Sequence, residues 1–280
     1  MSRLCDLHTH SVFSDGSCTP AQIVEQAVQL GLGAVALTDH NTVDGLPSFL
    51  DAARGKPIEV VPGAEFSVDY QGDELHILGL FICPTAFSQV SALMAQVNRQ
   101  KEESNLRLIA SLRRVGVILD YQKIKDATPK GLVNRANIAR ALVKQGYTRT
   151  VSEAFDTLLS PAQGHYQEPK RLTAAEIIDF ITSIHALPVL AHPFVSLTED
   201  KLLPFLPIAK QWGLCGMECY YSEYSSATTQ KALQIAREMG LLPSGGSDYH
   251  GLTKPDIMLG TGKGDLRVPF EAYLAMKEKI

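Results

Sequence analysis

"LCDLHTHSVFSDGS", residues 4–17, begins as an apolar strand and ends in a turn that is rich in groups able to bind a metal ion. One residue separates His8 from His10, and Asp15 follows five residues later. Side chains alternate between the two faces of a strand, so both imidazole rings point to one side and can reach the same ion. This pattern predicts a metal site at the end of a first strand.

Short apolar strands alternate with amphipathic helices in the first and last parts of the chain. This pattern favours parallel βα units over a β-sandwich or a helical bundle. The capping-box residues Thr19 and Gln22 predict the start of a first helix, and Thr173 and Glu176 predict the start of a later one. The expected strands are residues 3–8, 33–40, 58–66, 74–81, 187–193, 214–220 and 242–250.

The middle of the chain breaks this rhythm. Residues 88–160 contain no convincing strand, and helical patterns run through 98–116, 135–146 and 151–160. We therefore expect an α/β barrel in two parts, residues 1–87 and 167–280. Residues 88–166 are expected to form a mainly helical insertion that covers the active site.

Composition excludes several classes of protein. The net charge of −4 provides no broad basic surface, so a surface that coats DNA is not expected, and affinity for phosphate must come from a few local Lys or Arg residues. The five cysteines are scattered without a Cys-x-x-Cys pair, which indicates reduced thiols in a cytoplasmic protein. No leader or apolar run suited to a membrane span is visible, so no membrane association is expected.

Groups that can bind metal ions recur where the expected strands end, which is where catalytic residues gather in βα folds. Six of the eight histidines are among them, although a single histidine or carboxylate of this kind is often only a core or turn residue. The set is His8, His10, Asp15, Asp39, His40, Glu65, His76, His192, Glu218, Asp248 and His250. Nitrogen and oxygen donors without thiolate favour Mn²⁺, Fe²⁺ or Zn²⁺, and their number suits two or three ions with Glu65 as a bridge.

Six segments together resemble the PHP (polymerase and histidinol phosphatase) domain: "DLHTHSVFSDGS", "ALTDHNTVDG", "PGAEFS", "LHILGL", "LAHP" and "GGSDYH". Within that family the sequence resembles the TrpH-like branch, which includes 3′,5′-nucleotide bisphosphate phosphatases and 5′→3′ oligoribonuclease-type enzymes. The resemblance implies a distorted (β/α)7 TIM-like barrel with a helical insertion. It also implies a trinuclear site, with Mn²⁺ as the first choice of metal and Zn²⁺ or Fe²⁺ as alternatives.

The resemblance assigns the ligands of each ion. His8, His10, Glu65 and Asp248 would hold the first, Glu65, His76 and His192 the second, and Asp15, His40 and His250 the third. Many relatives have a histidine at the position of Asp15, so the third ligand set departs from the common pattern.

Substrate phosphates need basic partners, and the helical segment and the loop after it offer Arg135 and Lys170. The branch often has Arg-x-His-Ile-Ala where this chain has Asn137 in place of the histidine, which alters one expected substrate contact. A solvated helix arginine is the alternative for Arg135. Glu218 and the loop 220–226 are further candidates for lining the pocket.

The reaction implied is hydrolysis of a phosphomonoester by metal-activated water, with Glu65 and Asp248 holding the ions. Either His192 or a metal-bound water would protonate the leaving group. The expected substrate is a nucleoside 3′,5′-bisphosphate, which loses its 3′-phosphate. The alternatives are 5′→3′ trimming of short RNA, histidinol-phosphate hydrolysis, an amidohydrolase or deaminase reaction, and a metal-bearing module without catalytic activity.

Overall fold

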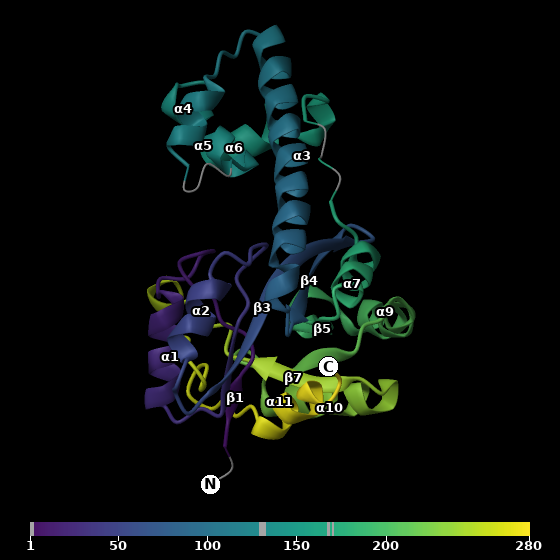
Figure 1. The fold of residues 1–280 in the computed structure, drawn as a ribbon. Coiled ribbons are helices and arrows are strands. Elements are labelled where there is room, and N and C mark those ends of the chain that lie inside the picture. The colour runs from purple at the N-terminus through teal and green to yellow at the C-terminus, as the bar shows by residue number, and fades with distance from the viewer. Residues whose placement is uncertain (1–2, 129–132, 167–168, 170) are drawn as a thin grey trace. The chain divides into compact units, whose positions relative to one another are not determined.

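The computed structural model describes residues 3–128, 133–166, 169 and 171–280. The chain divides into two compact units. Unit 1 comprises residues 1–91 and 172–280, and unit 2 comprises residues 92–171. The two units are described separately below, and their elements are labelled in Figure 1.

Unit 1 is a seven-stranded sheet that curls into a nearly closed barrel, as the sequence predicts (Figure 1). The strands follow one another in chain order within the sheet. The barrel closes between the last strand and the first, because Leu7 N donates to Gly245 O (3.1 Å) and Asp248 N donates to His8 O (2.9 Å). The strands are β1 Cys5–Asp6, β2 Ala34–Leu37, β3 Glu59–Tyr70, β4 Asp73–Leu80, β5 Leu187–Leu190, β6 Gly216–Tyr221 and β7 Leu242–Gly246.

The expectation that all strands run parallel is wrong for β4, which is antiparallel to both β3 and β5. The reason lies in Gln71 and Gly72, which adopt positive φ angles of 55° and 91°. Two such residues form the tight hairpin loop that joins antiparallel strands directly, without a crossover helix. As a result β3 extends to Tyr70, and His76 lies in the middle of β4 and not at its end.

Helices surround the strands of unit 1 (Figure 1). Both predicted capping boxes are present: Thr19 and Gln22 cap α1, and Thr173 and Glu176 cap α7. One apolar core cluster of unit 1 includes Leu7, Leu78 and Val189. The helices are α1 Pro20–Gln29, α2 Leu46–Ala53, α7 Ala174–Ser183, α8 Pro193–Ser196, α9 Glu199–Trp212, α10 Ser226–Met239 and α11 Phe270–Lys277, with 3-10 turns at Pro84–Ala86 and Gly251–Thr253.

Unit 2 is helical and has a core of its own, built from residues such as Leu108, Leu112, Ile138 and Leu142. The described part of residues 88–160 contains no strand, in line with the sequence pattern. The six-residue helix α4 was not expected. That this unit covers the active site stays a prediction. Its helices are α3 Phe87–Arg114, which begins in unit 1, α4 Tyr121–Asp126, α5 Arg135–Lys144 and α6 Val151–Asp156, followed by a 3-10 turn at Pro161–Gln163.

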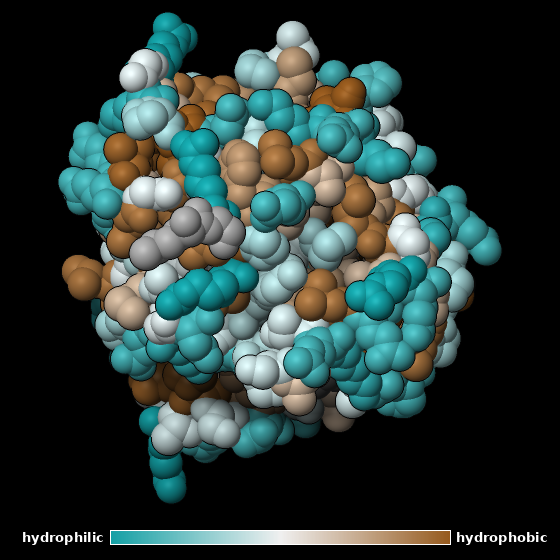
Figure 2. Space-filling view, turned by 90° about the horizontal axis from the view of Figure 1, so that it is seen from below, coloured by the Kyte–Doolittle hydropathy of each residue, from teal (hydrophilic) through white to brown (hydrophobic). Residues whose placement is uncertain are grey.

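Hydrophobic and hydrophilic residues are interspersed on the face of the molecule seen from below (Figure 2). Such a mixture is usual for protein surfaces. Within the part of the chain that the structure covers, no helix combines the length and the apolar character needed to cross a bilayer. All five cysteines are free thiols.

Candidate metal centre

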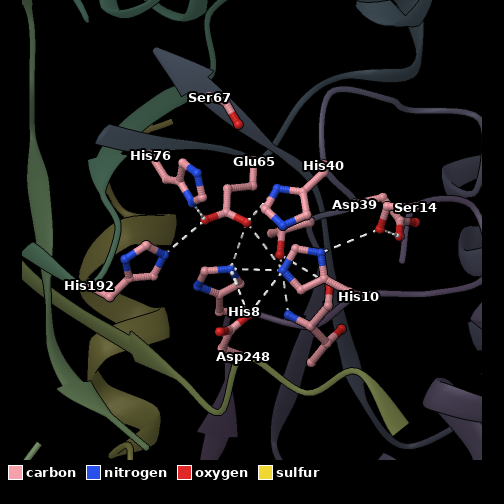
Figure 3. Close-up of polar contacts among 12 residues, drawn as sticks. His8, His10, Ser14, Asp39, His40, Glu65, Ser67, His76, His192 and Asp248 are labelled. Carbon is pink, nitrogen blue, oxygen red and sulfur yellow. Dashed lines mark hydrogen bonds and ion pairs between the residues drawn. The ribbon is translucent and has the colours of Figure 1, made fainter. Parts of the chain in front are cut away.

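The Glu65 carboxylate is the hub of a cluster of imidazole rings in unit 1. Figure 3 shows it between His76 and His192 on one side and His8, His10 and His40 on the other. Glu65 is almost fully buried on β3. Its Oε1 lies 2.8 Å from His76 Nδ1 and 3.1 Å from His192 Nε2, and its Oε2 lies 3.0 Å from His40 Nδ1, 3.2 Å from His10 Nε2 and 3.3 Å from His8 Nε2.

The hairpin explains why His76 reaches Glu65 although its strand runs the other way. His76 pairs with Ser67, and Glu65 pairs with Leu78, across the β3–β4 ladder. Residues two apart share a face, so Glu65 and His76 are diagonal neighbours on one side of the sheet. The His76 side chain therefore reaches the Glu65 cluster from inside β4, whereas the parallel strands supply their ligands from their ends.

A second group of ligand atoms gathers around Asp248 and Asp15. Asp248 Oδ1 lies 3.2 Å from His10 Nε2, 3.6 Å from His8 Nε2 and 3.5 Å from His250 Nδ1. Asp15 Oδ1 is 3.2 Å from His250 Nε2. The Asp15 side chain is about half exposed, whereas those of His8 and His10 are fully buried. The cluster is thus closed at β1 and open toward solvent at Asp15.

The donor set fits divalent cations. Among the described residues, no hydrogen-bond partner is found for the buried atoms His40 Nδ1, Glu65 Oε2, His76 Nδ1, His192 Nδ1 and His250 Nε2. His76 Nδ1 and His40 Nδ1 nevertheless lie within 3.0 Å of Glu65 oxygens, so these atoms are close but not aligned for hydrogen bonds. A metal ion binds ligand atoms whose lone pairs point to one place with no proton between them. Burying these polar atoms with no partner at all would cost free energy.

The electrostatics of the cluster also call for positive charge. Burial would raise the pKa of Glu65, but the positive charge of His8 and the contacts with His10 and His192 hold it well below its usual value. Burial would lower the pKa of His8 and His10, but the neighbouring carboxylates outweigh it and raise the pKa of His10 to about 9. Ionised carboxylates therefore dominate the interior of the cluster, and either protons or metal ions must balance them.

Family comparison supports the same chemistry. The sequence profile of the PHP domain matches residues 6–179. The chain belongs to the PHP domain family. A structure from Bifidobacterium adolescentis, of a protein proposed to be a metal-dependent phosphoesterase, superposes with a TM-score of 0.70 at 25% identity, covering 100% of this chain and 97% of that one. The protein is a metal-dependent phosphoesterase of this family.

Curated relatives of this PHP protein span nearly its whole length. A 5′-3′ exoribonuclease of Haemophilus influenzae is 29% identical over 251 residues, which is 89% of this chain and 91% of that protein. A 3′,5′-nucleoside bisphosphate phosphatase of Chromobacterium violaceum is 28% identical over 251 residues, which is 88% of this chain and 86% of that protein. Both names describe hydrolysis of nucleotide phosphate esters.

The ligand groups differ in detail from those implied by the PHP resemblance. His8, His10 and Glu65 form one group whose ligand atoms lie within 4.8 Å of one another. The group expected around Asp15 also includes His10, and the group at His76 contains His40 where His192 was expected. The groups are His10, Asp15, His40 and His250; His8, His10 and Glu65; and His40, Glu65 and His76. His192 reaches only the Oε1 side of Glu65.

Two buried carboxylates, Glu218 and Asp39, hold the ligand rings in position, a role that was not expected from the sequence. Glu218 on β6 binds His8 Nδ1 through Oε1 (3.0 Å) and accepts from His192 N through Oε2 (2.7 Å). Asp39 accepts from Ser11 and Ser14, and the Ser14 hydroxyl lies 3.5 Å from His10 Nδ1. Metal-binding histidines usually have such a partner on the second ring nitrogen.

The strand end that carries Asp248 is fixed from both sides. Tyr221 Oη and Lys254 Nζ donate to Asp248 Oδ2 at 2.9 and 2.8 Å, which leaves Oδ1 to face the histidines. On β1, Asp6 accepts from Ser247 N (2.9 Å) and Ser247 Oγ (2.5 Å). The contact of Asp6 with Ser247, and the contacts of Tyr221 and Lys254 with Asp248, were not expected from the sequence. The only signal for Lys254 was a basic residue shortly after "GGSDYH".

Backbone strain also gathers at the site. His192 and Asp248 adopt positive φ angles of 26° and 57°, and Asn41, next to His40, has a φ of 53°. Left-handed conformations cost free energy for residues other than glycine and persist where the surrounding structure enforces them. Two hydrogen bonds hold these residues in place: His192 N donates to Glu218, and Asp248 N donates to His8 O.

The predicted phosphate-binding residues do not belong to the cluster unit. Arg135 and Asn137 lie on α5 of unit 2, where the Arg135 guanidinium stacks 4.3 Å from the ring centroid of Tyr166. Asn137 forms a capping box with Asn134. Lys170 lies outside the described residues. Contact of these three residues with substrate therefore stays a prediction.

Proposed function

We propose that this protein removes the 3′-phosphate of nucleoside 3′,5′-bisphosphates, such as adenosine 3′,5′-bisphosphate. The observation that carries the proposal is the convergence of six histidines and three carboxylates around Glu65 and Asp248 in a PHP phosphoesterase. The Chromobacterium violaceum relative with this activity in its name supports the choice of substrate.

The nine ligands proposed are His8, His10, Asp15, His40, Glu65, His76, His192, Asp248 and His250. They would hold two or three ions, and Mn²⁺ is our first choice because the donors are nitrogen and oxygen. When bound, such ions lower the pKa of coordinated water toward ~7 and neutralise charge on phosphate oxygens. Glu65 offers one oxygen to each side of the cluster, as a bridging carboxylate does.

The chain's own groups prepare the site before substrate arrives. Glu218 holds the His8 ring through Nδ1, so His8 Nε2 is turned toward Glu65 and Asp248. Tyr221 and Lys254 hold the outer oxygen of Asp248. These fixed contacts spare the site from reorganising during the reaction, which is the main way in which enzymes stabilise developing charge.

The leaving oxygen needs a proton, and its source would be a coordinated water where His192 serves as a ligand, or His192 where it does not. His192 Nε2 contacts Glu65 Oε1, while its Nδ1 is buried without a partner. For the substrate's second phosphate we propose Arg135, Lys170 and Asn137 as binding residues. Arginine can bind phosphate in a bidentate manner, and lysine acts as a point charge.

A second candidate function uses the same centre on a phosphodiester. Relatives named as 5′-3′ exoribonucleases, including the Haemophilus influenzae protein, cover almost all of this chain. Stepwise hydrolysis of short RNA from its 5′ end would need the same bridging carboxylate and histidines.

Phosphate release tests these proposals. The purified protein, supplied with Mn²⁺, is offered adenosine 3′,5′-bisphosphate, histidinol phosphate and a length series of 5′-phosphorylated oligoribonucleotides. Preferred release of the 3′-phosphate from the bisphosphate supports the first candidate. Preferred formation of mononucleotides from the longer chains supports the second, and cleavage of histidinol phosphate alone contradicts both. Release of ammonia from an amide or amine substrate without phosphate hydrolysis would indicate an amidohydrolase or deaminase reaction.

A further inference from the structure

The two units carry opposite charge. Residues 92–171 contain 14 Lys and Arg against seven Asp and Glu, a net charge of +7. The remaining residues contain 12 Lys and Arg against 23 Asp and Glu, a net charge of −11, and the two values give the −4 of the whole chain. The total therefore conceals a cationic helical unit, and asymmetry of this kind is typical of proteins that bind polyanions.

Part of this charge lines a groove within unit 2. The groove has a volume of about 400 Å³ and lies between α4 and α5. Its cations are Lys123, Arg140 and Lys144. Asp120 and Asn137 are among its other lining residues.

The cations on α5 have no internal counter-charge. Arg140 and Lys144 are both exposed and stand four residues apart on one face of the helix. Among residues that the structure covers, neither forms a salt bridge, whereas Lys125 on the neighbouring helix pairs with Glu102 at 2.5 Å. Like charges at this spacing destabilise a helix slightly. A ligand that brings negative charge would remove this repulsion.

The other polar groups of the groove are compatible with such a ligand. The Asp120 carboxylate already has partners within α4: it accepts a hydrogen bond from Lys123 N and lies 3.5 Å from Lys123 Nζ. Asn137 Oδ1 accepts from Asn134 N at 2.9 Å, so the oxygen of this side chain is used. Its amide NH₂ group has no acceptor in the described part of the chain and is available to donate.

The cations of the groove differ from those of the phosphate clamp proposed above, although Asn137 belongs to both. Arg135 stands five residues before Arg140 and points to another face of α5, where it stacks on Tyr166 and lies 5.7 Å from the ring centroid of Phe155. Neither ring belongs to the groove. Arg140 and Lys144 are therefore free for a separate contact.

We infer that this groove binds the phosphodiester backbone of a single-stranded oligonucleotide. A cationic channel that follows the backbone is the usual device of proteins that bind single strands. Arginine and lysine both suit phosphate groups, because the guanidinium can contact two oxygens at once and the ammonium acts as a point charge. The inference goes beyond the proposed function, because binding here requires neither the metal cluster nor Arg135.

The test uses the whole 280-residue chain and fluorescence anisotropy. The probe is a 3′-labelled single-stranded oligoribonucleotide with phosphorothioate linkages, which keep the negative charge and resist hydrolysis. Arg140→Gln combined with Lys144→Gln should weaken binding on the order of tenfold at low salt. The slope of log affinity against log salt should fall by about 1.4, because each lost phosphate contact removes about 0.7 for single strands. A deoxyribose probe of the same sequence shows whether the sugar contributes.

The matched control is Arg113→Gln combined with Arg114→Gln, which removes the same charge from exposed positions in the last turn of α3. Equal weakening by both pairs would show that net charge and not the groove is responsible, and would overturn the inference. So would unchanged binding in the groove variant, or equal displacement of the probe by polyglutamate at matched charge.

A second readout separates this inference from the proposed function. Arg140 and Lys144 are not part of the proposed catalytic machinery, so hydrolysis of adenosine 3′,5′-bisphosphate should be the same in the groove variant and the wild type. A protein that binds the probe through the groove but does not cleave the bisphosphate retains this inference and contradicts only the proposed substrate. The reverse result, cleavage without groove binding, contradicts only this inference.

Discussion

The Nε2 atoms of His8 and His10 lie 3.0 Å apart, and both also lie within 3.3 Å of Glu65 Oε2. Two ring nitrogens and one carboxylate oxygen at such distances can share only a limited number of protons. A divalent cation between them satisfies all three at once. This pair follows β1 and is fully buried, whereas the side chains of His40 and His76 are partly exposed.

Replacing Glu65 by glutamine should remove metal and activity together. The change keeps the shape of the side chain but removes the charge that both sides of the cluster share. We expect turnover to fall by more than the roughly 10–100-fold that is typical of losing a supporting residue. Metal content measured on purified protein should fall in parallel.

Glu59→Gln is the control for this prediction, because Glu59 begins the same strand and pairs with Tyr273 and Lys277 far from the cluster. It should keep metal and turnover. Full activity of the Glu65 variant with normal metal content would show that Glu65 is not a ligand.

Glu218→Gln should weaken metal binding without abolishing turnover. Glu218 contacts His8 Nδ1 and His192 N, so its loss frees a ligand ring and a strained backbone without removing a ligand. Loss of such a partner typically lowers metal affinity about 10–100-fold. Activity titrated against Mn²⁺ should shift to higher concentration and recover at saturation. Glu223→Gln, whose carboxylate pairs with Lys263 at the surface, should leave the titration unchanged.

Local patterns in the sequence predicted those parts of the fold that depend on neighbouring residues. The alternation of His8 and His10, and the capping residues at Thr19 and Thr173, follow from strand and helix periodicity alone. The reversal of β4 was missed although Gln71 and Gly72 are a local signal, because the apolar run at 74–81 looks the same in either direction. Helix α4, with six residues, is too short for a clear period.

The supporting contacts of the site could not be predicted from sequence, because they join distant parts of the chain. Asp6 and Ser247 are 241 positions apart, and Glu218 and His8 are 210 apart. Nothing in either local sequence indicates the other. These pairs appear only when the barrel closes and brings β1 beside β7 and β6 near both.

Gly246→Ala should destabilise the barrel where it closes. A Cβ atom at this position would overlap the backbone nitrogen and Cβ of His8, so β7 would have to move away from β1. Overpacking of this kind costs about 1–3 kcal/mol, and urea unfolding should show it as a lower midpoint. Ser244→Ala on the same strand is the contrast: its buried hydroxyl has no hydrogen-bond partner in the part of the chain that the structure describes, so its removal should be neutral or slightly stabilising. Equal destabilisation by both changes would contradict the steric argument.

Cys83 should be the first thiol of the native protein to react with a disulfide reagent. Its side chain is exposed, and a hydrogen bond from Thr85 Oγ1 (3.1 Å) lowers the pKa of the thiol. Burial instead raises the pKa of Cys215 to about 11 and that of Cys219 to about 12, and also raises the pKa of Cys5. Because the thiolate is the reactive form, one fast equivalent is expected near neutral pH, and these three thiols should react only after unfolding. Cys83→Ser should abolish the fast phase, and a fast phase that survives this change would place the reactive thiol elsewhere.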